Sequence, residues 1–291
     1  MADDGLFLAL GHEALRISST RGDSWSKPPE GDPKEKDRMI FRTAAYGNGV
    51  YVAAGKGSGG IFCPSRDGSN WDEVVTKKGI DCHNVCFGAG RFLAVGSDVN
   101  YNGTVFSYSE DGQSWSEPKE QKGKALLRIV YGDGKFVGVG ASGRRATSTD
   151  GVKWIDAEDN KIENTLIDVC YGNGLFVGVG LHGLSMVSED GIKWRDKQHT
   201  GREGEHYNSV MWTGDRFVAV GLLTTMESPD GVNWTRHESV NAPQYAAYGN
   251  GVFIGARWKG VLLRSKDAIE WEEIMDREAH VDAVVFCGSD G

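Results

Sequence analysis

A seven-residue stretch of the form S-x-D-G-x-x-W recurs along this chain and constrains its fold more than any other feature. Five copies match the pattern, beginning with Ser65–Trp71, and the first and last of the seven are degenerate. Ser265–Trp271 has Ala268 in place of the glycine, and Ser19–Trp25 has Arg21 and Gly22 where the Asp-Gly pair should stand. Successive tryptophans are 37 to 46 residues apart, so the chain consists of units of nearly constant length.

A second repeated stretch lies earlier in each unit, where an aromatic residue precedes a tight turn. Tyr46–Gly49 reads Y-G-N-G between two apolar runs, and this pattern predicts a β-hairpin. The related stretches begin at Phe87, Tyr131, Tyr171, Trp212 and Tyr248. Each unit therefore reads as four strands, A to D, with the S-x-D-G-x-x-W turn between strands C and D. A period of about 40 residues with four strands per unit predicts a β-propeller.

The two ends of the chain predict how the ring of blades closes. Gly5–Gly11 has the pattern of strand B, and Ala14–Trp25 supplies strand C and the start of strand D. Val281–Gly291 has the pattern of the missing strand A. Six complete units and this composite one predict an all-β, seven-bladed propeller with four-stranded blades, closed by the C-terminal strand A joining N-terminal strands B to D. We expect a single domain over residues 1–291, without the open sheet edges that promote aggregation.

Each residue type in the repeated turn has an expected physical role. The aspartate accepts hydrogen bonds from backbone N–H groups of its own turn, and the glycine supplies a positive φ. The tryptophan opens the next strand, and we expect its ring to be buried between blades. Burial of one such ring removes roughly 150–250 Å² from water. The seven tryptophans are therefore expected to form a large part of the core.

Composition and charge exclude several classes of function. The net charge of −9 argues against a nucleic-acid-binding surface, which needs clustered positive charge. No apolar run is long enough to span a membrane, and no signal-peptide pattern follows Met1. The five cysteines are expected to be buried free thiols, which favour a reducing compartment. We therefore expect a cytoplasmic protein with no nucleic-acid or membrane partner.

Motifs for cofactors and for covalent catalysis are not recognised. The glycine-rich stretch Gly55–Gly60 lacks the strand-to-helix setting of a phosphate-binding loop. The sequence contains neither a serine nucleophile elbow nor a C-x-x-C pair. No histidine pair shows the spacing of metal ligands. We therefore expect no cofactor and no metal.

Alignment of the A strands on their aromatic residues predicts a polar ring at one end of the central channel. Residues one and two positions before the aromatic are almost all apolar, whereas those three and four positions before it are mostly polar. Because A strands surround the channel of a propeller, these polar side chains are expected to face its mouth. They are Arg42, His83, Asn84, Arg128, Asp168, Asn208, Gln244 and Tyr245, with Asp282 near the same level. Loops between strands B and C and connections into strand A are expected to add His12, Lys56, Tyr101, Arg144, His182, His206 and Trp258.

Two interpretations of this face are open. Loop ends are polar wherever they meet water, and seven blades present some histidines by chance. Alternatively, the mixture of arginine, histidine, aspartate and aromatic side chains forms a ligand site. Carboxylates for acid–base chemistry could be drawn from Asp98, Asp168 and Asp282.

The S-x-D-G-x-x-W turn resembles the Asp-box, or bacterial neuraminidase repeat, of β-propellers, and the resemblance covers essentially the whole chain. That superfamily includes sialidases, other glycan-active enzymes, sorting receptors and photosystem assembly factors. Its Asp-boxes lie on the rim away from the sialidase active site, which implies a functional site at the opposite mouth here. The Asp-box is a structural signature and implies no activity. Residues 41–43 lack the isoleucine and proline of the Arg-Ile-Pro motif with which sialidases begin.

These observations predict a ligand-binding propeller that takes a small polar molecule, a glycan or a protein segment at the channel mouth. The first alternative is an enzyme at the same mouth, either a hydrolase or lyase acting on a glycan-like substrate or a metalloenzyme that uses several of the histidines. The second alternative is a scaffold that binds proteins by its rim.

Overall fold

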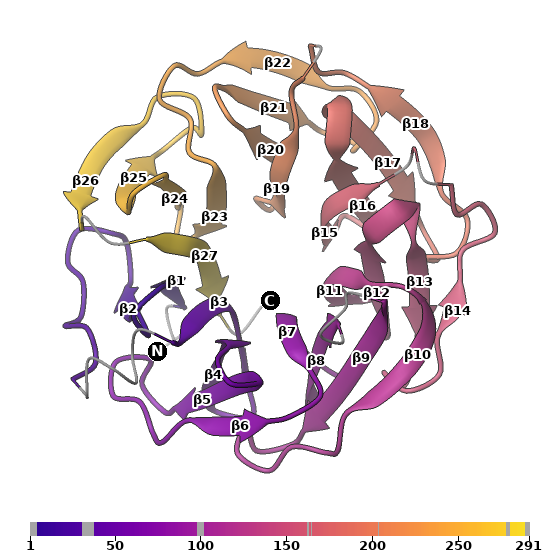
Figure 1. Cartoon of the computed structure of the whole chain (residues 1–291). Coiled ribbons are helices and arrows are strands. Elements are labelled where there is room, and N and C mark those ends of the chain that lie inside the picture. The colour runs from indigo at the N-terminus through magenta and orange to yellow at the C-terminus, as the bar shows by residue number, and fades with distance from the viewer. Residues whose placement is uncertain are drawn as a thin grey trace.

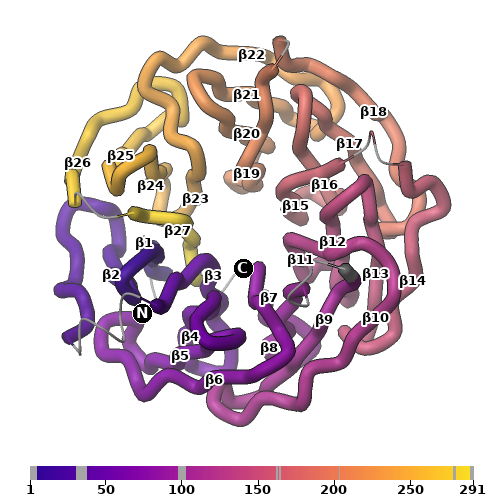
Figure 2. The backbone as a smooth tube through the Cα atoms, in the orientation of Figure 1, coloured from indigo at the N-terminus to yellow at the C-terminus, as the bar shows by residue number. Residues whose placement is uncertain are grey.

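The chain forms seven antiparallel β-sheets arranged in a ring, as Figures 1 and 2 show for the computed structural model. The structure describes residues 5–30, 38–97, 102–161, 163, 165–202, 204–277 and 280–288. In six sheets the first strand along the chain lies nearest the centre, and the later strands follow outward. This arrangement confirms the predicted seven-bladed propeller.

The six blades that are continuous in sequence have four strands each. Blade 1 consists of β3 (Ile40–Gly47), β4 (Val50–Lys56), β5 (Gly60–Ser65) and β6 (Val75–Lys77). Blade 2 consists of β7 (Asp81–Gly88), β8 (Arg91–Ser97), β9 (Asn102–Ser109) and β10 (Lys119–Lys124). Blade 3 consists of β11 (Leu126–Gly132), β12 (Lys135–Gly140), β13 (Arg145–Ser148) and β14 (Ile155–Asp156). Blade 4 consists of β15 (Leu166–Gly172), β16 (Leu175–Gly180), β17 (Leu184–Ser188) and β18 (Arg195–His199).

Blades 5 and 6 repeat the same order. Blade 5 consists of β19 (Tyr207–Trp212), β20 (Phe217–Gly221), β21 (Thr224–Ser228) and β22 (Thr235–Glu238). Blade 6 consists of β23 (Tyr245–Gly249), β24 (Val252–Arg257), β25 (Val261–Ser265) and β26 (Glu272–Asp276). Single 3-10 turns, η1 (Ala141–Gly143) and η3 (Leu181–Gly183), join the second and third strands of blades 3 and 4.

Blade 7 joins the two ends of the described chain. β27 (Val281–Cys287) lies innermost and pairs with β1 (Leu6–Gly11), which in turn pairs with β2 (Arg16–Ser19). Within residues 5–30 no further strand is assigned to this sheet, but the N–H of Ser26 donates to the carbonyl of Ser18, where strand D begins in other blades. The predicted closure of the ring by the C-terminal strand is therefore confirmed.

The repeated turn is held by one set of hydrogen bonds, as the Ser109–Trp115 copy illustrates. The Gly112 N–H donates to Ser109 Oγ over 2.9 Å, and Asp111 Oδ1 accepts from the backbone N–H groups of Gln113 and Ser114. The Ser114 N–H is the main reason that the pKa of Asp111 falls to about 2. The indole of Trp115 donates to the Gly112 carbonyl over 2.9 Å.

Both degenerate copies keep the core of this turn. The N–H of Ala268 donates to Ser265 Oγ over 2.8 Å, and Ala268 adopts the left-handed conformation with φ of 64°. In the first copy the N–H of Gly22 donates to Ser19 Oγ over 2.7 Å. The bond from the N–H at the fourth position to the serine Oγ thus occurs in six of the seven copies, including the first copy, which has Arg21 in place of the aspartate. In the Ser228–Trp234 copy, the serine Oγ accepts from the Asp230 N–H instead.

The tryptophan of each turn packs against the preceding blade. Trp115 stacks on Phe62 of blade 1 with ring centroids 3.8 Å apart, and Trp154 stacks on Phe106 of blade 2 at 5.0 Å. In two other interfaces an arginine replaces the phenylalanine, and the guanidinium of Arg145 lies 5.9 Å from the centre of a tryptophan ring. Three of the seven rings are buried and the other four are half-buried, so the expectation of full burial holds for only part of the set.

The two glycines of the Y-G-N-G stretch have different roles. The second, such as Gly134, has a positive φ of 73° and open space where a Cβ would lie. The first lies in extended strand beneath the aromatic ring of the next blade, so a Cβ on Gly132 would lie 2.3 Å from Tyr171. The same contact recurs in four other interfaces, including the closing one, where Phe286 covers Gly249. These contacts interlock neighbouring blades close to the channel.

The repeated turns lie on the face of the ring that carries the hairpins between first and second strands. The side-chain amide of Asn48, in the hairpin of blade 1, donates to the carbonyls of Gly90 and Glu110 in blade 2. Glu110 belongs to a repeated turn. Since each innermost strand ends at its hairpin, the starts of these strands lie on the opposite face, and that face carries the predicted mouth.

The state of the cysteines and the length of the helical segments bear on two of the expectations above. All five cysteines are free thiols, and Cys63, Cys82 and Cys287 are buried in the sheets. In the part of the chain that the structure describes, none of the helical segments has the length or apolar character needed to cross a bilayer.

Candidate binding site at the channel mouth

The innermost strands of all seven blades surround a central cavity of about 310 Å³. Its walls are apolar toward the hairpin face, as predicted, with alanine, valine and isoleucine side chains. Polar side chains line it toward the other end. Six of the predicted site residues meet there, namely Arg42, Asn84, Arg128, Asp168, Asn208 and Tyr245.

In most innermost strands, the residue three positions before the aromatic of the hairpin turn is polar. Several of these residues connect neighbouring blades by hydrogen bonds. Each accepts a hydrogen bond from the backbone N–H of the next innermost strand, which lies too far away to pair with it as a sheet. Asn84 Oδ1 accepts from Ile129 over 2.9 Å, and Asp168 Oδ2 accepts from Val210 over 2.8 Å. Thr43 and Ser209 accept in the same way from Val85 and Ala246. The sequence predicted the polarity of this ring but not its bonding to the neighbouring blade.

Arg128 and Asp168 line the cavity from the innermost strands of the neighbouring blades 3 and 4. Burial raises the pKa of the Asp168 carboxyl, and the positive charge of Arg128 acts in the opposite direction. Arg128 Nη1 donates to the backbone carbonyls of His83 and Leu127, each over 3.2 Å. The guanidinium is thereby fixed at the wall of the cavity.

A second group of charges at the mouth is centred on Asp81, which the sequence analysis missed. Its carboxylate lies 3.3 Å from Arg42 Nη1 and 3.1 Å from Lys56 Nζ. His83 Nε2 lies 3.0 Å from Ser97 Oγ, and burial lowers the pKa of this histidine to about 4. The sequence feature that could have identified Asp81 is a single acidic residue between the apolar residues Ile80 and Cys82, at the start of a predicted strand.

Blade 7 and the neighbouring blade 6 contribute a group of aromatic and acidic side chains to the same face. His12 Nε2 lies 3.4 Å from the Asp282 carboxylate, and the His12 ring is 4.8 Å from that of His280. Trp258 meets the His280 ring edge-on at 4.3 Å, and 63% of this tryptophan is exposed. Burial raises the pKa of Asp282, and the nearby charges of His12 and Arg42 oppose that shift. Asp282 therefore links this group to Arg42 and the Asp81 group.

The remaining predicted residues lie at blades 4 to 6. The rings of His182 and His206 are 5.2 Å apart, and the His182 backbone N–H donates to His206 Nδ1 over 3.0 Å. The Gln244 amide donates to the Tyr245 hydroxyl over 3.3 Å. No cluster of three or more histidine, cysteine or acidic residues suited to a metal ion occurs in the described ranges.

Arg144 does not reach the mouth. It is 4% exposed, and it joins blades 2 and 3 by donating to Thr104 Oγ1 and the Lys124 carbonyl while pairing with Asp156. The reason is the single 3-10 turn η1, which returns the chain so tightly that Arg144 falls between the blades. Tyr101 and Asp98 lie outside the described residues.

Comparisons with known proteins support the fold alone. No family model matches the chain, and no curated protein matches it. Among the solved structures with a similar fold is one described as "YCF48 bound to D1 peptide". It has a TM-score of 0.63 and 14% sequence identity to this chain, and the match covers 87% of this chain and 85% of that one.

Proposed function

We propose that this propeller is a binding module that holds a short polar segment of a partner protein at the channel mouth. The observation that carries the proposal is a single cavity to which all seven blades contribute and which is ringed by charges of both signs. Its volume of about 310 Å³ is near the lower limit of small-ligand pockets. A few side chains of an extended segment fit such a space, and a folded domain does not.

The groups at the mouth suit the polar parts of a peptide. Arg42 and Arg128 present guanidinium groups, which bind carboxylates and backbone carbonyls in a fixed orientation. Asn208 and Tyr245 add neutral donors and acceptors, and Trp258 offers an exposed apolar surface at the edge. A protein segment is favoured over a small molecule or a glycan because the structural neighbour is described as bound to a peptide.

Binding is favoured over catalysis by the partners of the mouth carboxylates. Asp168 accepts the Val210 N–H and so supports the neighbouring blade. Asp282 faces His12, and Asp81 is held between Arg42 and Lys56. Asp168 and Asp81 are therefore engaged within the protein, whereas a general acid or base must be able to exchange its proton with a substrate.

We also propose that the repeated turns are Asp-boxes. The proposal is supported by the shared bonds among the serine, the aspartate, the backbone and the tryptophan, and by the position of the turns on the face opposite the mouth. These turns stabilise the blades and leave the mouth as the functional face.

The experiment is a selection of peptides from a displayed random library, followed by affinity measurements on variants. Each selected peptide is titrated by fluorescence anisotropy against the natural chain and the R42Q/R128Q variant. Hydrogen bonds to a charged group contribute about 1.5–3 kcal/mol each, so we expect affinity to fall about tenfold or more. Arg91→Gln, on the hairpin face beside Tyr108, is the matched control and should bind as the natural chain does.

Thermal melts of the three proteins show whether each variant is folded. If selection yields no peptide, or if the selected peptides bind R42Q/R128Q and the natural chain equally, the proposed function is wrong.

A further inference from the structure

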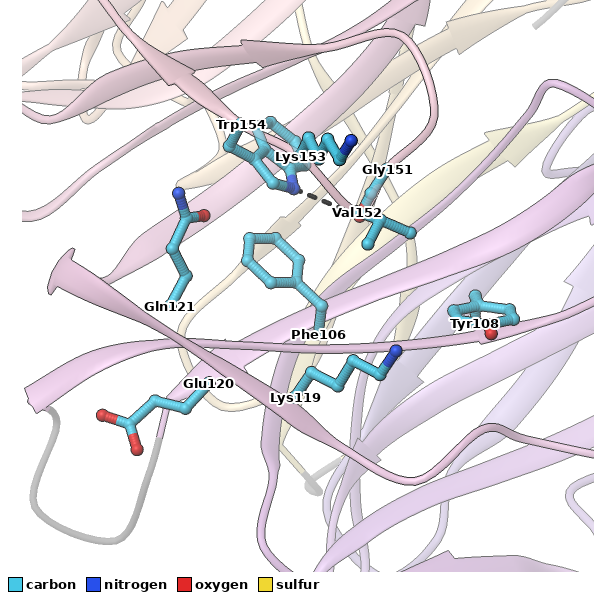
Figure 3. A pocket seen from close by; sticks show the side chains of 9 residues that line it. All are labelled: Phe106, Tyr108, Lys119, Glu120, Gln121, Gly151, Val152, Lys153 and Trp154. Atoms are coloured by element: carbon cyan, nitrogen blue, oxygen red, sulfur yellow. Dashed lines mark hydrogen bonds between the residues drawn. The ribbon is translucent and has the colours of Figure 1, made fainter.

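A second cavity lies between blades 2 and 3 on the outer side of the ring. It has a volume of about 330 Å³ and shares no lining residue with the central cavity. Phe106 and Tyr108 of β9, residues 119–121 of β10 and the repeated turn 151–154 of blade 3 line it (Figure 3). We call this cavity the rim pocket.

The floor of the rim pocket is apolar. The Phe106 and Trp154 rings are stacked with an interplanar angle of 15°, and Figure 3 shows Val152 beside them. Val152 is 46% exposed, although it belongs to a turn whose tryptophan is buried. An exposed valine next to two stacked rings offers a surface for one large apolar side chain, since covering it removes apolar area from water.

The outer wall of the rim pocket is fixed by Arg144. This buried side chain donates to the Lys124 carbonyl over 2.8 Å at the end of β10. Gly123 lies directly against the guanidinium, where a Cβ would be 2.9 Å from its central carbon. The wall is therefore anchored to blade 3, and the cavity does not depend on a loop that can close over it.

The rim of the pocket is basic although the whole chain carries a net charge of −9. Lys119 and Lys153 line it and both are exposed. Lys153 lies in the same turn as Asp150, whose pKa its positive charge helps to lower. Lys122 and Lys124 follow on β10. The one acidic lining residue is Glu120, and Figure 3 shows its carboxylate directed away from the Phe106 ring.

One polar atom of the lining has an unmet hydrogen-bonding requirement. Gln121 Oε1 is buried and has no donor within the part of the chain that the structure describes. A buried carbonyl without a donor is costly, so the amide gains a bond when Gln121 turns its Oε1 toward the backbone N–H of a bound segment.

We propose that the rim pocket binds an acidic segment of a partner protein that carries one large apolar side chain. The apolar side chain occupies the space above Phe106 and Trp154, flanking carboxylates pair with Lys119 and Lys153, and a backbone N–H bonds to Gln121. The site is independent of the channel mouth, because the two cavities lie on different surfaces and share no residue.

The test uses three fluorescein-labelled peptide mixtures of seven residues. In the first, three Asp or Glu residues flank each side of a central Phe, Trp or Leu. The second has serine at the centre, and the third has Lys or Arg in the flanks. We expect saturable binding, measured by anisotropy and confirmed by competition with unlabelled peptide, for the first mixture alone. Absence of binding, or equal binding of the serine or the basic mixture, would overturn the proposal.

Variants locate the bound peptide. K119E/K153E is expected to weaken binding of the first mixture about tenfold or more, because two attractive contacts become repulsive. K193E/K197E makes the same change of charge at the turn and outer strand of blade 4, and it should leave binding unchanged. R42Q/R128Q should also leave it unchanged. Equal effects of the two lysine pairs, or loss of binding in the channel variant, would contradict a site at the rim.

Discussion

Replacing Gly132 by alanine tests the interlocking of neighbouring blades. An added Cβ would lie 2.3 Å from Tyr171 Cγ, whereas ordinary contact begins at 3.4 Å, so the ring must retreat by about 1 Å. Phe176, 4.8 Å from the Tyr171 ring centroid, restricts that movement. Overpacking of this kind costs about 1–3 kcal/mol, and the restricted ring places the expected loss of unfolding free energy in the upper half of that range.

Gly134→Ala in the same hairpin is the matched control. It has no atom within 4 Å of the added Cβ, but its φ of 73° costs an alanine about 1–2 kcal/mol. Both substitutions are therefore destabilising, for different reasons. Only the first depends on Tyr171.

A double-mutant cycle with Tyr171→Ala separates the two causes. Free energies of unfolding are measured by urea titration of tryptophan fluorescence, with equal m-values as the condition for comparison. Once the ring is removed, the cost of Gly132→Ala should fall by about 1 kcal/mol but not vanish, because the Cβ of residue 171 still lies 2.7 Å from the added methyl group. The cost of Gly134→Ala should change by less than about 0.5 kcal/mol. An unchanged cost at residue 132 without the ring, or equal coupling at both glycines, would refute the close-approach argument.

Three further predictions concern stability. Hydrogen bonds to the turn aspartates hold the pKa values of Asp67, Asp111 and Asp230 at about 2, below the ordinary 3.8. Their contribution to the free energy of unfolding is therefore present above pH 4 and lost as the pH falls to 2. Urea titrations across this range should show that loss, and a variant with all three aspartates replaced by alanine should show less of it. Burial lowers the pKa of His83 from 6.5 to about 4, so protonation favours the unfolded chain. The free energy of unfolding should therefore fall as the pH drops from 6.5 to 4. His83→Gln should reduce this pH dependence, and an unchanged dependence would assign it to other groups. Arg144→Ala removes charged hydrogen bonds to Thr104 Oγ1, the Lys124 carbonyl and Asp156 and leaves a space between blades 2 and 3, so thermal or urea unfolding should show a loss of about 2–4 kcal/mol, against almost none for Lys122→Ala.

Much of the fold could be predicted because its signals are local and repeated. The turn residues impose their own backbone geometry, so their spacing alone indicated the number of blades. Pairing of β27 with β1 followed from complementary patterns at the two ends. The role of Gly132 could not be predicted from the sequence. No Cβ fits at this position because the Tyr171 ring of the next blade occupies that space.

The candidate site was less predictable, because side-chain direction depends on the neighbouring blade. Position along the innermost strand sufficed to bring Arg42 and Arg128 to one cavity. It could not show that Asp168 supports the Val210 N–H, since that bond crosses between blades. Arg144 was placed at the mouth because its loop was assumed to be open, whereas a 3-10 turn directs it between blades. Asp81 was missed because the strand begins earlier than the aligned segment.

The most direct test of the account is a crystal structure of the chain with a peptide selected from the displayed library. The proposed function predicts peptide density in the central cavity, with polar atoms within hydrogen-bonding distance of Arg42 and Arg128. A peptide bound elsewhere, with no density in that cavity, would contradict it.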